Sequence, residues 1–270
     1  MLFVSTSGAL GRYIDLSPTL TIATRSILAF IILYGYCRYR GFSFNVAKKH
    51  RLPILLSGVF LGAHWVTYFY SLQLSSVAIG MLSLFTYPII TAFLEPLLLK
   101  TNFQKVHLFL GLLVLAGIYL LNPSFDFQSG QTLAVAIGIL SAVFYSLRNI
   151  ILKNRVGEYN GSSLMCFQMG VIGVFLSPFF FFDEVQNIPQ QLPWILILAF
   201  LTTAIGHTLF LNCFRHFSIT TISILSSIQP IYGIILGAIF LREYPDIMTV
   251  FGGILILSAV AIESLRTQKT

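Results

Sequence analysis

Long apolar segments alternate with short polar breaks along nearly the whole chain. Ten such segments can be placed, separated by charged residues, proline or glycine. They cover residues 2–14, 18–37, 53–72, 76–99, 107–121, 132–152, 163–182, 192–214, 218–241 and 247–265. Most approach the roughly 20 residues that a helix needs to cross a bilayer. The pattern therefore predicts an all-α membrane protein with ten transmembrane helices.

The first apolar segment is shorter than a full span. Its 13 residues would rise only about 20 Å as a helix, against a hydrocarbon core of roughly 30 Å. We therefore expect a truncated first helix, whose beginning lies upstream of Met1. Segment 107–121 is also short, although its apolar pattern could extend into residues 103–106.

The composition excludes the soluble classes of protein. Apolar residues make up 56% of the chain and charged residues 9%, whereas a soluble domain is about 25% charged. Ten spans leave no residues for a separate extramembrane domain, so a soluble enzyme, a nucleic-acid binder and a secreted scaffold are all excluded. Cys37, Cys166 and Cys213 lack any CxxC spacing, so the sequence indicates no disulfide framework, metal site or other cofactor.

The basic residues are distributed unevenly between the two sides of the membrane. If the amino end is cytoplasmic, Arg148 and twelve loop bases lie at the inner side, and only Arg12 and Arg242 lie outside. This is a strong positive-inside bias. It predicts a multi-pass protein of the cytoplasmic (inner) membrane with both termini in the cytoplasm, and it accounts for most of the net charge of +7.

The two halves of the chain resemble each other. A shift of 142 residues places Pro88 on Pro230 and Gly111 on Gly253, and one further residue of shift places His64 on a second histidine, at position 207. The match predicts two five-helix halves, residues 1–125 and 126–270. Because five is odd, the second half enters the membrane from the opposite side, which gives the inverted repeat of secondary transporters with a solute site between the halves.

Intramembrane enzymes need motifs that this sequence lacks. No aspartate lies inside a predicted span, and HExxH and GxSxG are both absent. We therefore predict that the protein is not an enzyme.

The polar residues inside the spans are the candidates for function, because burying them in a bilayer is costly. At about 1.5 Å per residue, both matched histidines and both matched prolines lie near mid-membrane. Proline removes a helical hydrogen bond, and such helix breaks are tolerated where the backbone lines a cavity. The candidate cavity lining is His64, Tyr68, Tyr87, His207, Gln229 and Tyr232, with Pro88 and Pro230 as helix breaks. The alternative is that the prolines are simple kinks and that each histidine donates to a carbonyl between packed helices.

Two charged residues lie inside predicted spans. Arg25 and Glu95 sit at levels about 14 Å apart in a core of about 30 Å, so we do not expect them to pair. Arg25 is expected to extend towards the outer surface or to meet a carbonyl, and Glu95 to pair with Lys100 or Arg148. Glu95 is the only acid well inside a span, which makes it a candidate for proton coupling.

Three stretches resemble the EamA branch of the drug/metabolite transporter superfamily. They are GAHWVTYFYSLQ (62–73), SVAIGMLSLFTYPIITAFLEPLLL (76–99) and its second copy ITTISILSSIQPIYGIILGAIFLRE (219–243). The resemblance implies ten helices in an inverted repeat, cytoplasmic termini and a central cavity, and it adds Tyr145 to the lining. The first copy departs from the second at its end, where Lys100-Thr101 stands in place of Arg242-Glu243.

These observations predict a secondary carrier that moves a small organic solute by alternating access. The resemblance implies that the solute is an amino acid or related metabolite and that the carrier exports it. An importer of a nucleotide-like metabolite and a lipid-handling scaffold are the alternatives. The aromatic and neutral-polar lining favours an uncharged, zwitterionic or aromatic solute over a multiply charged anion, which would need several buried bases. The expected partners are the solute and the lipid bilayer. The sequence does not indicate an oligomeric state.

Overall fold

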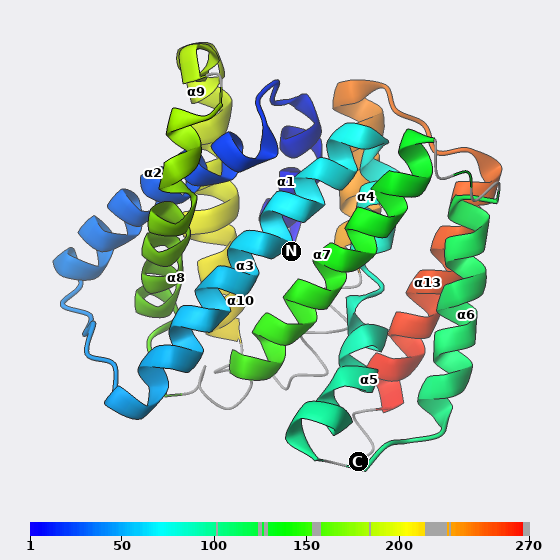
Figure 1. Ribbon diagram of the computed structural model, residues 1–270. Coiled ribbons are helices and arrows are strands. Elements are labelled where there is room, and N and C mark those ends of the chain that lie inside the picture. The colour runs from blue at the N-terminus through cyan, green and yellow to red at the C-terminus, as the bar shows by residue number, and fades with distance from the viewer. Residues whose placement is uncertain are drawn as a thin grey trace.

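The computed structural model describes residues 1–100, 102–123, 126, 129–152, 158–183, 185–213, 226 and 228–266. Every regular element in these ranges is a helix (Figure 1). The α-helices are α1 (Leu2–Tyr13), α2 (Pro18–Tyr39), α3 (Lys48–Leu74), α4 (Val77–Leu84), α5 (Tyr87–Leu99), α6 (Val106–Leu121), α7 (Gly130–Leu152), α8 (Gly161–Leu176), α9 (Ile188–Ile197), α10 (Thr208–Cys213), α12 (Gln229–Leu236) and α13 (Ile247–Arg266). Two 3-10 segments, η1 (Ser177–Phe181) and η2 (Val185–Asn187), and two π-helical segments, η3 (Leu198–His207) and η4 (Gly237–Leu241), complete the set.

Seven helical stretches within the described residues are long and apolar enough to cross a bilayer. They are Pro18–Tyr39, Lys48–Leu74, Val77–Leu99, Gly130–Leu152, Gly161–Phe181, Val185–Cys213 and Ile247–Arg266. Two shorter apolar stretches, Val106–Leu121 and Gln229–Leu241, and the 12-residue α1 accompany them. The all-α membrane architecture is thus confirmed. The count of ten spans stays a prediction, and most of the first ten residues of predicted segment 218–241 lie outside the described residues.

Two predicted helix starts are wrong by about a turn. Helix α9 begins at Ile188, four residues before the predicted start at residue 192. Helix α3 begins at Lys48, five residues before the predicted start at Pro53. Its first turn is basic, and an apolar pattern cannot detect a helix that continues past the edge of the hydrocarbon.

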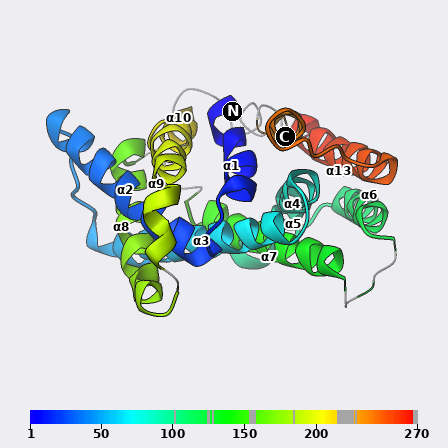
Figure 2. The same ribbon diagram turned by 90° about the horizontal axis from the view of Figure 1, so that it is seen from above.

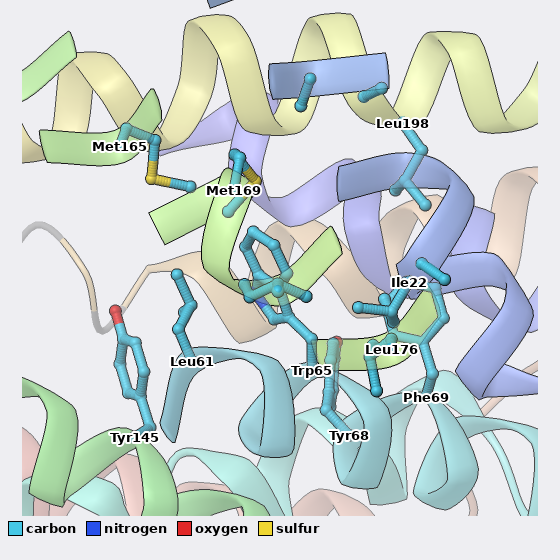
Figure 3. Close-up of a cluster of buried hydrophobic side chains, with 14 of the residues drawn as sticks. Ile22, Leu61, Trp65, Tyr68, Phe69, Tyr145, Met165, Met169, Leu176 and Leu198 are labelled. Carbon is cyan, nitrogen blue, oxygen red and sulfur yellow. The ribbon is translucent and has the colours of Figure 1, made fainter. Parts of the chain in front are cut away.

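The helices form three groups side by side when the molecule is seen from above (Figure 2). Helices α2, α8, α9 and α10 lie on one side, α6 and α13 on the other, and α1, α3, α4, α5 and α7 between them. Helix α3 packs along α7, α2 along α8, and α6 along α13. The larger core lies between the middle group and the group that contains α8, where Leu61, Trp65 and Phe69 of α3 project towards Met165 and Met169 of α8 (Figure 3).

Helices α6 and α13 approach each other through glycine. A Cβ atom on Gly252 of α13 would lie 2.7 Å from the carbonyl oxygen of Gly117 of α6, and one on Gly117 would lie 2.9 Å from that of Gly252. Real Cβ atoms do not come this close to backbone. The crossing therefore requires glycine at both positions.

The two matched prolines both stand near the beginning of a helix. Helix α4 ends at Leu84, and α5 begins at Tyr87 with Pro88 as its second residue. Pro230 is likewise the second residue of α12. Proline is tolerated at this place because the first amide groups of a helix have no intrahelical acceptor.

Four hydrogen bonds join residues 1–125 to residues 126–270 at one end of the molecule. Arg12 Nε of α1 donates to Glu243 Oε1 at 2.9 Å, and the backbone amide of Val77 donates to Glu243 Oε2 at 2.9 Å. Nearby, the hydroxyl groups of Ser17 and Thr19 donate to Asp183 Oδ2 at 2.6 and 2.8 Å. We call the Arg12, Val77 and Glu243 contact the end latch. It ties α1 and the beginning of α4 to the end of the segment that contains α12.

Candidate functional site

A cavity lies among α1, α3, α4, α5, α7, η3 and α12. Its lining is Val4, Ser7, His64, Trp65, Tyr68, Met81, Leu84, Phe85, Tyr87, Tyr145, His207 and Gln229. Six of the seven residues proposed for the lining from sequence are in this set. Seven helical segments from both halves of the chain thus bring these side chains together.

Tyr232 is the exception, and its placement corrects the expectation. Its side chain is 39% exposed, and it does not line the cavity. The buried positions of α12 and η4 are Gln229, Pro230, Gly233 and Gly237, which form one stripe at helical spacing. Tyr232 follows the exposed Ile231 on the other face of the helix. Tyr232 was expected to share the face of Gln229, three residues before it, but the buried stripe continues from Gln229 to Gly233 and Gly237 instead.

His64 has a defined hydrogen-bonding partner in α7. Its Nδ1 lies 2.7 Å from Ser141 Oγ, and that hydroxyl donates to the backbone carbonyl of His64 at 2.9 Å. Because a serine hydroxyl has a single proton, Nδ1 of His64 must be the donor to Ser141. In the neutral ring, Nε2 is then left as an acceptor. His64 therefore bonds a hydroxyl, and not a carbonyl as the alternative expected.

Aromatic rings form most of the cavity wall. The ring of Tyr145 lies 4.6 Å from that of His64 and 4.8 Å, edge-on, from that of Tyr87. On the other side, the ring of Trp65 lies 5.2 Å from that of His207. Such contacts position the rings and leave their polar atoms for other partners. Trp65 was missed from sequence, although it stands next to His64 and three residues before Tyr68.

Arg25 contradicts the expectation that it extends outwards or meets a carbonyl. Its side chain is fully buried, with Nε donating to Thr203 Oγ1 at 2.7 Å and Nη2 to Thr202 Oγ1 at 3.0 Å. The guanidinium carbon stacks 3.9 Å from the centre of the Trp65 ring. These partners come from η3 and α3. The sequence argument used only the depth of Arg25 within its own helix, which says nothing about the residues of other helices.

Arg148 of α7 is a second buried arginine, with 3% of its surface exposed. Its Nη2 donates to Gln168 Oε1 at 3.1 Å and its Nη1 to Asn149 Oδ1 at 3.0 Å. Gln168 in turn donates to Ser57 Oγ at 2.9 Å. The chain of bonds connects α7, α8 and α3 next to the cavity wall, since the guanidinium carbon lies 5.9 Å from the Tyr145 ring.

Replacing Gln168 by leucine should destabilise the protein by about 2 kcal/mol, because a buried charged group then loses a hydrogen bond. Gln104→Leu is the matched control, since Gln104 accepts a similar bond from Arg266 at the exposed surface. We expect that control to change stability by less than about 0.5 kcal/mol. Thermal unfolding of the purified protein measures both, and equal shifts would contradict the assignment.

Glu95 lies outside the cavity lining. It sits in α5, four residues before the last residue of that helix, and is partly exposed. Among the described residues, no group of three histidine, cysteine, aspartate or glutamate side chains could hold a metal ion.

The comparisons with known proteins point to one family. The model of the EamA-like transporter family matches residues 1–122 and 132–265. The pseudopaline exporter CntI of Pseudomonas aeruginosa strain UCBPP-PA14 is 25% identical over 248 residues, which cover 91% of this chain and 85% of that protein. The threonine/homoserine exporter RhtA of Escherichia coli K12 is 24% identical over 228 residues, with 82% and 73% covered. These relatives are transporters and not enzymes.

A solved crystal structure shares the fold. It superposes with a TM-score of 0.67 at 16% sequence identity and covers 99% of this chain and 98% of its own. An uncharacterized transporter of Helicobacter pylori strain J99 is also similar, at 25% identity over 89% of this chain and 83% of its own length.

Proposed function

Because the chain belongs to the EamA-like transporter family, we propose that it is a secondary carrier of the cytoplasmic membrane that exports a small organic solute. An amino acid or related metabolite is the proposed class of solute. The observation that carries the proposal is the cavity, whose polar and aromatic lining comes from both halves of the chain. Two of the relatives are themselves named as exporters of small solutes.

The helix contacts support an inverted repeat of residues 1–125 and 126–270. Exchanging each helix with its counterpart in the other half maps α2–α8 and α6–α13 onto themselves. The same exchange converts the α3–α7 contact into the α1–η3 contact, and α5–α7 into α1–α12, all of which are present. This is the pattern that a two-fold relation between the halves would produce. The carrier would work by rocking these halves around the cavity.

The end latch supports an assignment of the side of the membrane on which the cavity is closed. Arg12 and Glu243 lie at the side that the distribution of basic residues predicts to be periplasmic, and they connect the two halves there. The termini are accordingly proposed to be cytoplasmic. A carrier by alternating access must break such contacts when it opens to that side.

The proposed solute-binding residues are His64, Tyr68, Tyr87, Tyr145, His207 and Gln229. We expect a His64→Ala, His207→Ala double variant to lose at least about tenfold of its transport rate, since both rings contact the other aromatic side chains of the wall. The measurement compares small metabolites inside and outside cells that express equal membrane levels of each protein. A His50→Ala, His107→Ala double variant is the matched control, because those two histidines lie outside the cavity.

Each outcome selects one reading. Solutes that leave the cell only with the wild type and the control support the carrier. Accumulation inside the cell would support the importer instead. Movement of labelled lipid without any dependence on solute would support the lipid-handling scaffold.

A further inference from the structure

Two buried guanidinium groups lie behind the cavity wall, each next to an aromatic ring of that wall. Arg25 stacks on Trp65, and Arg148 approaches Tyr145, and both of those rings line the cavity. Among the described residues, the hydrogen-bond acceptors of the two arginines are neutral oxygens, from Thr202, Thr203, Asn149 and Gln168. Within the described part of the chain, no ion pair joins either arginine to a carboxylate.

Hydrogen-bond donors at this place are left without acceptors. Among the described residues, Arg25 Nη1, Arg148 Nε and the hydroxyl of Tyr68 are buried and have no hydrogen-bond partner. Tyr68 is 3% exposed, lines the cavity, and lies close enough to Arg25 for an electrostatic interaction. Its hydroxyl points towards α1, where it lies 3.1 Å from the place of a Cβ atom on Gly8. All three atoms are donors, and the Tyr68 hydroxyl is the one that belongs to a residue of the cavity lining.

A buried charge without a counter-charge opposes folding. Two threonine hydroxyl groups and a stacked indole offset part of this cost for Arg25, but they do not neutralise the charge. A residue that is unfavourable for stability and remains next to a cavity is typical of a binding site. In the low-dielectric interior, a guanidinium one ring behind the wall still acts strongly on a charge in the cavity.

We propose that the solute bears a carboxylate group. The positive charges of Arg25 and Arg148 together attract this group, and the Tyr68 hydroxyl binds it directly. This inference rests on the proposed carrier function and names the chemical class of its solute. Arg25 and Arg148 act as positioning residues, since Trp65 and Tyr145 separate them from the cavity.

The donor set favours a carboxylate over a phosphate. Among the described residues that line the cavity there is no arginine or lysine, whereas a multiply charged phosphate is typically bound by such side chains directly. A cationic solute would be repelled by both arginines.

The test begins with the solutes that depend on the wild-type protein for export. We expect every one of them to carry a carboxylate. Each is then added to the purified wild-type protein, beside its carboxamide, and thermal unfolding is recorded. The acid should raise the unfolding temperature and the carboxamide should not. This comparison needs no variant, so it decides the question even where variants do not fold.

Three variants locate the effect. Arg25→Gln should reduce export at least about tenfold and abolish the stabilisation by the acid, while the protein without solute unfolds at or above the wild-type temperature. Arg25→Lys should retain part of both. Arg51→Gln removes an arginine at the exposed surface and should change neither.

The results distinguish a failure of the carboxylate proposal from a failure of the carrier proposal. Export of a solute without a carboxylate, or equal stabilisation by an acid and its carboxamide, would overturn this proposal and leave the carrier standing. No protein-dependent solute of any kind would reject the carrier itself, and the present inference with it.

Discussion

Gly252→Leu is expected to abolish most of the folded protein. Position 252 faces the carbonyl oxygen of Gly117 at a distance that no side chain can occupy, and a backbone atom cannot rotate away as a side chain can. Helices α6 and α13 would have to separate, and we expect a loss of stability of about 3 kcal/mol, at the upper end for overpacked sites. Size-exclusion chromatography and thermal unfolding of the detergent-purified protein measure the effect.

Gly35→Leu is the control for this substitution. A Cβ atom on Gly35 of α2 would meet nothing within 4 Å, so the same change of residue should leave folding nearly intact. Gly252→Leu protein that does fold should still exchange solute, because α6 and α13 do not contribute to the cavity lining. Equal losses from both substitutions would show that glycine matters here for a reason other than the crossing.

Glu243→Ala should shift the carrier towards the state that is open at the end latch. The carboxylate accepts hydrogen bonds from Arg12 and from the amide of Val77, and its removal leaves both donors unpaired. The ion pair itself is partly exposed, at 34% and 24% of the two side chains, so its contribution is modest. Together with the bond to the amide we expect about 1.4 kcal/mol, which is a tenfold change in the equilibrium between the states.

Labelling of a cavity cysteine measures this shift. Ser7 lines the cavity beyond the latch, so Ser7→Cys can be introduced after the three native cysteines are replaced by alanine. A membrane-impermeant maleimide should react about tenfold faster when Glu243 is also alanine. Asp15→Ala removes an exposed acid of the loop that follows α1 and should not alter the rate. A rate that Glu243→Ala leaves unchanged would mean that the contact does not hold the halves together.

The sequence predicted the all-α membrane architecture and much of the cavity lining. Apolar length located the seven helical stretches that are long enough to cross a bilayer, because a bilayer demands about 20 apolar residues for each span. The two halves aligned His64 with His207 and Tyr87-Pro88 with Gln229-Pro230, and these residues line or adjoin one cavity. Sequence reasoning worked where one helix fixed both the depth and the face of a residue.

Sequence reasoning failed where the position of a side chain depended on contacts with a second helix. The position of Arg25 is determined by Thr202 and Thr203, which follow it by more than 170 residues. Tyr232 was misplaced because the buried stripe of α12 is set by its contact with α4, where a Cβ atom on Gly233 would collide with Met81. Ser141, the partner of His64, carried no sequence signal, since serine is common in membrane helices.

The π-helical form of η3 explains how two adjacent threonines reach one guanidinium. In a π-helix the hydrogen bonds run between residues five apart, so each turn holds more residues and neighbours project closer together than in an α-helix. Thr202 and Thr203 consequently both donate to the carbonyl of Leu198 and both accept from Arg25. If this stretch tightened into an α-helix, one threonine would rotate off the arginine, and His207 at its end would turn with it. The winding of a single helix thus links the hydrogen bonding of a buried charge to the direction in which a cavity side chain faces.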